Sequence, residues 1–230
     1  MTAVLNGLRR HLRLLLVLVV AQLTTSALPL IRWFTYVPDI QEGWLSSIWR
    51  NYSSVLVMFW LWMVAIVVMG IGAWWSREVD DGFYLEVWRH RSYRMWLAER
   101  IRFGALMVLV VLGLGMASPL AASHSGQGVE VLVVTALLVL YVAGLSLSVV
   151  ALSLAGMRTS LAVTVVLLFH LTNVIFDGLG LPNVVRFFLL AEDASALSAA
   201  FGVGTLAVAT TVVLLMSTPE GLMRRGSDAR

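Results

Sequence analysis

The 230-residue chain is 60% hydrophobic and only 13% charged, with a mean hydropathy of +0.89. Such a composition excludes a soluble enzyme domain, because a chain in water could not hide that much apolar surface. The net charge is +3, but the charged residues lie between apolar runs rather than on one exposed helix face, which argues against nucleic-acid binding.

Two residue types are absent, and each absence excludes a chemistry. The chain has no cysteine, which removes disulfides, thiolate nucleophiles and Cys-ligated metals. All sixteen basic residues are arginine, so the lysine that a phosphate-binding P-loop requires is also missing. If ATP drives this protein, another chain must hydrolyse it.

Six uncharged apolar runs follow one another along the chain. Because a bilayer core takes roughly 20 apolar residues per helix, we expect an all-α membrane protein with six transmembrane helices in a single domain over residues 1–230. The expected helices cover residues 12–31, 53–75, 103–121, 131–154, 161–176 and 197–216. A cleaved secretory signal is the alternative for the first run, since a basic start precedes it and Thr-Thr-Ser-Ala lies near its end.

The connections between these runs predict the orientation. With the N-terminus inside, thirteen of the sixteen arginines fall on one side, which indicates a cell-membrane, multi-pass protein with both termini cytoplasmic. The longest polar stretch, residues 77–102, belongs to that side and is expected in water or on the membrane surface. Residues 155–160 read as a tight turn, while Gly178, Gly180 and Pro182 predict a short outer helix between spans five and six.

The start of the 77–102 stretch predicts a cytoplasmic helix with an apolar tip. Asp80 or Asp81 can cap this helix. The candidate partner-binding residues are the glycine at its start, its apolar side chains and the charges around them: Gly82, Phe83, Leu85, Glu86, Val87, Trp88, Arg89 and Arg91. The groove of a rigid partner could hold such a tip, or the helix could lie on anionic lipid, and periodicity does not separate the two.

Polar residues are few inside the expected spans. His170, Asn173 and Asp177 are spaced i, i+3 and i+7, so they share one face of the fifth helix, and Gln22 lies in the first. These four are the candidate lining of a translocation path. The alternative is hydrogen bonding between helices within the bundle, which buried polar groups require whatever the function.

Nothing in the sequence assembles a catalytic or metal site. His11, His90, His124 and His170 fall at different expected levels, and neither H-E-x-x-H nor G-x-S-x-G occurs. We therefore expect no enzymatic activity, no catalytic residue, no metal and no cofactor on this chain.

Residues 78–100 carry a resemblance to a known family. The segment Glu78-x-x-x-Gly82 followed by Leu85-Glu86, with an arginine-rich entry into the third span, resembles the ABC-2 type transporter permeases. That resemblance implies that Gly82–Arg94 forms a coupling helix against an ABC ATPase subunit holding ATP and Mg. It also implies a second permease copy, as a homodimer or a related heterodimer, and export of an amphipathic or hydrophobic substrate.

Two other functions stay open from the residues themselves. One is the substrate-binding membrane subunit of a vitamin-uptake system, which would hold a small molecule tightly. The other is a non-transport membrane scaffold, in which the arginine-rich stretch binds a partner or lipid without nucleotide-linked motion.

Overall fold

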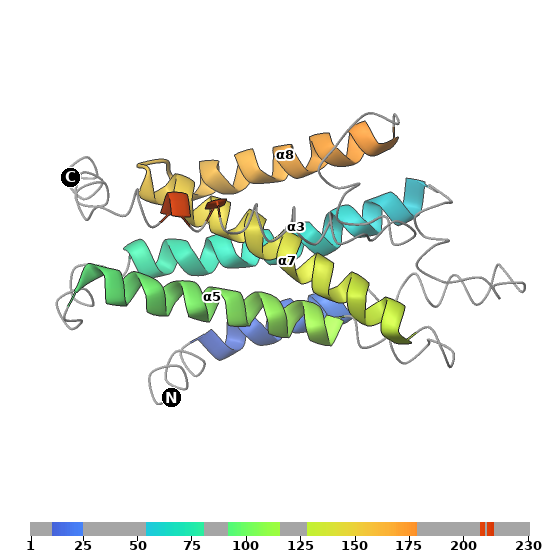
Figure 1. Ribbon diagram of the computed structural model, residues 1–230, viewed down its shortest axis with the longest axis horizontal. Coiled ribbons are helices and arrows are strands. Elements are labelled where there is room, and N and C mark those ends of the chain that lie inside the picture. Colours follow the sequence, from blue (N-terminus) through green and yellow to red (C-terminus); the bar gives the residue numbers. More distant parts are fainter. Residues whose placement is uncertain are drawn as a thin grey trace, which may run out of the picture.

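The computed structural model describes residues 11–24, 54–80, 92–115, 128–178, 208–209 and 211–213. A helix covers residues 11–24, followed by α3 (Ser54–Asp80), α5 (Tyr93–Gly115), α7 (Gly128–Leu154) and α8 (Thr159–Gly178), all running along the long axis of Figure 1. All regular structure in these residues is helical, which confirms the all-α prediction.

Local hydrogen bonds explain where two of the helices begin and end. Ser92 precedes α5, and its side-chain oxygen accepts a bond from the N–H of Met95 at 3.3 Å, as an N-cap residue does. After α7 the chain turns at Gly156, whose φ of +102° suits glycine, while the N–H of Met157 bonds to the carbonyl of Leu152 at 3.1 Å. This turn leads directly into α8 and confirms the tight connection predicted at 155–160.

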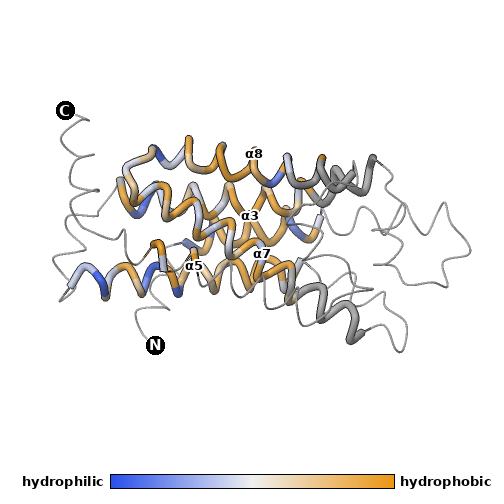
Figure 2. Tube along the Cα trace, turned by 45° about the horizontal axis from the view of Figure 1, so that its top comes forward, coloured by the Kyte–Doolittle hydropathy of each residue, from blue (hydrophilic) through white to orange (hydrophobic). Residues whose placement is uncertain are grey.

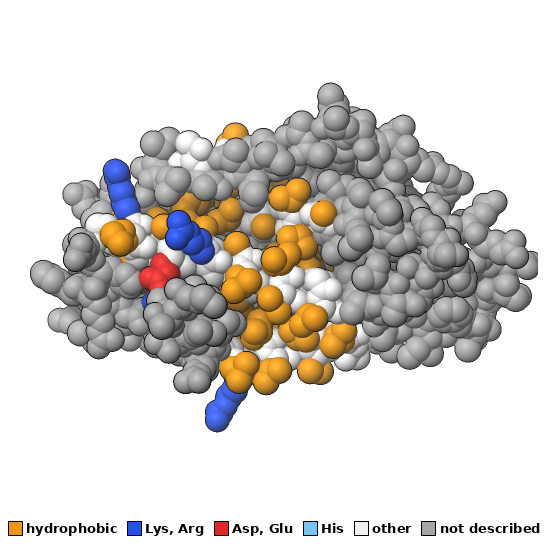
Figure 3. All heavy atoms as spheres, turned by 60° about the horizontal axis from the view of Figure 1, so that its bottom comes forward, with side chains coloured by type: hydrophobic (Ala, Val, Ile, Leu, Met, Phe, Trp, Pro, Cys, Tyr) orange, Lys and Arg blue, Asp and Glu red, His pale blue; other side chains and the backbone are white. Residues whose placement is uncertain are grey.

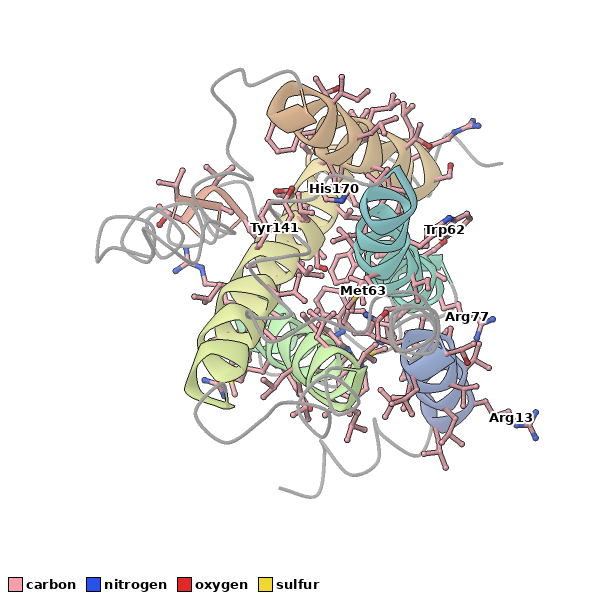
Figure 4. All side chains as sticks on the ribbon, turned by 90° about the vertical axis from the view of Figure 1, so that its right-hand side faces the viewer. Arg13, Trp62, Met63, Arg77, Tyr141 and His170 are labelled. Carbon is pink, nitrogen blue, oxygen red and sulfur yellow. The ribbon has the colours of Figure 1, made fainter. Side chains whose placement is uncertain are left out.

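The bundle is arranged around α3. Figure 4 looks along the bundle, with α8, α7 and α5 around α3. The helix of residues 11–24 lies beside α3, on the side away from α7. α3 contacts α5, α7 and α8, and α7 contacts both α5 and α8. Gly72 permits the close approach of α3 to α8, because a Cβ there would overlap the side chain of Val163.

The core is apolar along the middle of the bundle, as Figure 2 shows by the orange of the central turns. Large side chains from different helices meet in it, and Trp75, Trp96, Leu97 and Leu112 are fully buried. Burial of such side chains contributes roughly 1.5–3 kcal/mol each, which makes this core the main source of stability in the described residues.

Membrane crossing is where the structure departs from the sequence-based prediction. Measured over the side chains that the structure describes, no helix is both long enough and apolar enough to cross a membrane. The prediction of six transmembrane helices is therefore wrong on this criterion. Crossing a membrane takes roughly 20 residues. The described part of the first helix covers only residues 11–24, and the continuous run of described side chains in α7 covers only residues 138–154.

Charged residues account for the shortfall in α3 and α5. α3 ends with Arg77, Glu78 and Asp80, and α5 has Glu99 and Arg100 within its first ten residues. The 77–102 stretch, expected wholly in water or at a membrane surface, in fact belongs to helices at both ends. The expected coupling helix, apart from Ser92 and from Tyr93 and Arg94 of α5, lies outside the described residues, as does the expected outer helix beyond Gly178.

Candidate functional site

A group of three ionisable side chains, called here the charged cluster, joins three helices at one end of the bundle. Glu78 of α3 contacts His11 of the first helix, with Oε1 2.8 Å from His11 Nε2. Its other oxygen lies 3.1 Å from Nε of Arg100 on α5, an ion pair whose atoms are not aligned as a hydrogen bond. A carboxylate only accepts, so the His11 nitrogen donates to it.

The charged cluster is withdrawn from solvent. The Glu78 side chain is 1% exposed, that of His11 5% and that of Arg100 12%. Rings surround it: His11 lies edge-on to Trp74, with centroids 6.4 Å apart, and 5.7 Å from Phe103. In such a surrounding the attraction between opposite charges is strong, and loss of Arg100 would leave the Glu78 carboxylate buried without that counter-charge.

The charged cluster lies next to the segment from which the sequence predicts partner binding. Glu78 lies in the last turn of α3 and Arg100 in the first turns of α5, so the cluster ties together the two helices that flank residues 81–91. His11 fixes both to the first helix. Any force applied to residues 81–91 would reach α3 and α5 next to this junction.

A second polar contact, called here the neutral pair, lies between α7 and α8. Tyr141 Oη is 2.8 Å from His170 Nδ1, and the two side chains point toward one another in Figure 4. His170 is 1% exposed, and burial lowers its pKa to about 4, while burial raises the pKa of Tyr141 well above its usual value. Both groups are therefore uncharged at neutral pH.

The predicted path residues are not gathered into one described group. Gln22 is fully buried against α5, where a Cβ on Gly115 would overlap its side chain. His170 instead contacts Tyr141 of α7. Asn173 and Asp177 belong to α8, but their side chains lie outside the description, so a path lined by these residues stays a prediction.

The predicted partner-binding residues, from Gly82 to Arg91, lie outside the described residues and also stay a prediction. Among the residues that the structure does describe, no three His, Asp or Glu side chains are close enough to share a metal ion.

Sequence reasoning missed the charged cluster, although one signal pointed to it. Glu78 continues the spacing of the buried face of α3, formed by Val64, Val68, Ile71 and Trp75, so a helix extending past residue 75 would bury it. We expected residues 77 onward to be in water, which hid that continuity. His11 and Arg100, its partners, are 67 and 22 positions away, and no local pattern pairs them.

Comparisons with models of protein families, with curated proteins and with solved structures found no match for this chain.

Proposed function

We propose that this chain is a membrane-associated subunit without enzymatic activity of its own, working in a transport assembly whose ATP is hydrolysed by a separate subunit. The observation that carries this is the charged cluster: Glu78 in the last turn of α3 and Arg100 in the first turns of α5 join the two helices that flank segment 81–91. A partner that moves this segment would move both helices together, with the first helix attached through His11.

The need for a separate ATPase rests on composition and on the family resemblance of residues 78–100. A chain without lysine cannot build the P-loop that holds the phosphates of ATP. An apolar tip such as that expected from Phe83, Leu85 and Trp88 is suited to a groove on a partner.

Association with lipid is supported by the distribution of polarity. Apolar side chains lie on the outside of the first helix and along α8, where Leu161, Val165, Leu168 and Ile175 form an exposed stripe. Figure 3 shows hydrophobic side chains over the middle of another described face. Exposed apolar side chains gathered in this way mark a surface that contacts lipid or another protein.

Co-purification tests the partner. The tagged full chain, expressed with the genes that adjoin its own, would be isolated in mild detergent and assayed for ATP hydrolysis. We expect hydrolysis in the purified complex, and at least a fivefold loss when Phe83, Leu85 and Trp88 are replaced by alanine together. A wild-type preparation that contains no nucleotide-hydrolysing protein would refute the assignment.

Lipid contact is tested separately with single nitroxide labels, which the absence of native cysteine makes unambiguous. In vesicles, a label at Leu168→Cys should collide with dissolved oxygen more often than with a water-soluble nickel complex. The matched control is Ser92→Cys, exposed at the start of α5 outside the apolar stripe, where nickel should dominate. Dominance of nickel at both positions would exclude lipid on α8.

A further inference from the structure

An open groove of about 210 Å³ lies between α5 and α7, with α3 as its floor. It is lined by parts of residues 100–108 on α5 and 143–150 on α7, which correspond to about 10–12 Å of helix axis. Small side chains leave this space, since Gly104, Ala105 and Ala143 all belong to the lining. Ala105 is exposed and Ala143 is half-buried, so the groove opens to the surroundings of the bundle.

The dimensions and the surface of this groove fit a single hydrocarbon chain. An extended chain advances about 1.2 Å per bond, so the groove has the length of about eight to ten carbons. Its volume spread over that length gives a cross-section of about 20 Å², far too narrow for a helix about 10–12 Å across. The exposed surface of the lining is almost entirely apolar, so an occupant gains by leaving water and needs no hydrogen-bonding group within the groove.

Positive charge lies at one end of the groove. The first turns of α5 and the last turn of α7 are at the same end of the bundle in Figure 1. Arg94 precedes Ile101 and Ala105 by seven and eleven residues, which places it on the groove face of α5. Arg158 follows α7 at this end, and both arginines are exposed. Glu99 lies about 140° around α5 from Arg94, away from the groove.

An apolar groove that ends at exposed arginines matches a molecule with a hydrocarbon chain and an acidic head. In Figure 3, which brings the side with α5 forward, hydrophobic side chains cover the middle and the described arginines lie in the left-hand half. Basic residues in such a place attract anionic lipid at a membrane surface. Between Arg94 and Arg100 lie about 9 Å of helix axis, which is room for the polar part of a lipid before its chain enters the groove.

We propose that this groove binds one acyl chain of an anionic phospholipid, whose phosphate lies next to Arg94 and Arg158. The inference rests on the lipid association proposed above and gives it a defined site. The site is formed by α3, α5 and α7, so its occupation does not depend on an ATPase partner or on residues 81–91.

Lipid retention by the purified full chain tests the site. The chain would be reconstituted with equal amounts of phosphatidylglycerol and phosphatidylcholine that carry the same acyl chains, extracted into mild detergent and weighed by native mass spectrometry. We expect one retained lipid per chain, with about fivefold more phosphatidylglycerol than phosphatidylcholine, the preference that one arginine near an anionic group supplies.

The charge of the headgroup site is tested by paired substitutions. Arg94→Gln combined with Arg158→Gln should remove the preference for phosphatidylglycerol. The matched control is Arg13→Gln combined with Arg77→Gln, which removes the same charge from exposed arginines that point away from α7 in Figure 4. This control should keep the preference of the wild type. Loss of the preference in both double variants would overturn the assignment to Arg94 and Arg158.

Filling the groove provides the second arm. Ala143→Phe should lower the retention of both lipids about tenfold, because the chain loses its buried contacts, whereas Val165→Phe on the exposed face of α8 should change neither. If Ala143→Phe does not fold, Ala105→Phe at the open edge takes its place. Equal retention of the two lipids by the wild type, or full retention by the filled variant, would overturn the site.

The nitroxide label at Leu168 separates this failure from that of the proposed function. If the label still reports lipid while the groove retains none, only the groove site is refuted. If nickel dominates at the label, the lipid association is refuted together with the groove site.

Discussion

The charged cluster and the neutral pair are both buried between helices, yet one carries formal charge and the other does not. In the neutral pair, burial holds Tyr141 and His170 uncharged, and a hydrogen bond joins Tyr141 Oη to His170 Nδ1. The charged cluster keeps an ion pair in a ring of aromatic side chains, where two opposite charges must stay together. Packing alone explains the first arrangement, whereas the second joins α3 and α5, the two helices that flank residues 81–91, to the first helix.

Removal of the central carboxylate should have the largest effect. Glu78→Gln keeps the shape but removes the buried carboxylate that pairs with Arg100 and accepts from His11, and we expect a loss of roughly 3–5 kcal/mol in the free energy of unfolding. Denaturant titration in detergent measures this. Glu99→Gln, a half-buried glutamate on α5 outside the cluster, is the control and should cost less than about 1 kcal/mol. An equal loss of unfolding free energy in Glu78→Gln and Glu99→Gln would contradict a special role of Glu78 in stability.

Acid should weaken the neutral pair. The folded-state pKa of His170 is about 4 against 6.5 for the free side chain, so the unfolded chain binds more protons between these values. The contribution of His170 is complete above pH 6.5 and is lost as the pH falls toward 4, by on the order of 2–3 kcal/mol. Unfolding of the wild type and of His170→Gln across this range would test it, and identical pH dependence would contradict it.

Loss of the tyrosine hydroxyl should have a smaller effect. Tyr141→Phe keeps the ring but removes the partner of His170 Nδ1, which should lower the free energy of unfolding by about 1–2 kcal/mol. Ser148→Ala, also on α7, removes a bond confined to its own helix and should change stability by less than about 0.5 kcal/mol. Thermal unfolding of both variants compares them, and a Tyr141→Phe protein as stable as the wild type would show that the contact contributes nothing.

Replacement of two glycines of α5 by alanine should change stability least, and in opposite directions. A Cβ at Gly115 would overlap Gln22, whereas nothing lies within 4 Å of one at Gly113. Gly115→Ala should therefore destabilise by about 1 kcal/mol through overpacking, while Gly113→Ala should stabilise by about 0.5–1 kcal/mol through helix propensity. Unfolding temperatures of the two variants provide the check, and the same sign for both would mean that the first helix does not pack on α5 as described.

Sequence reasoning predicted α7 and α8 to within three residues at each end, because uninterrupted apolar runs border the turn at Gly156. It failed at the end of α3 and the start of α5, where charged residues suggested solvent. Glu78 is buried there only because His11 and Arg100 reach it from other helices, and pairing over such separations is a property of the packed fold. The family resemblance of Glu78-x-x-x-Gly82 also includes Glu78, but as part of a coupling motif and not as a buried partner of His11 and Arg100.

The distance between the first helix and α5 tests the central role of Glu78 most directly. Nitroxides at Leu16→Cys and Met95→Cys, both exposed, would report it by pulsed electron resonance in the otherwise cysteine-free chain. We predict one narrow distance distribution in the wild type and in Glu99→Gln, and a clearly broader one in Glu78→Gln. A distribution in Glu78→Gln as narrow as that of the wild type would contradict the claim that Glu78 holds these helices together.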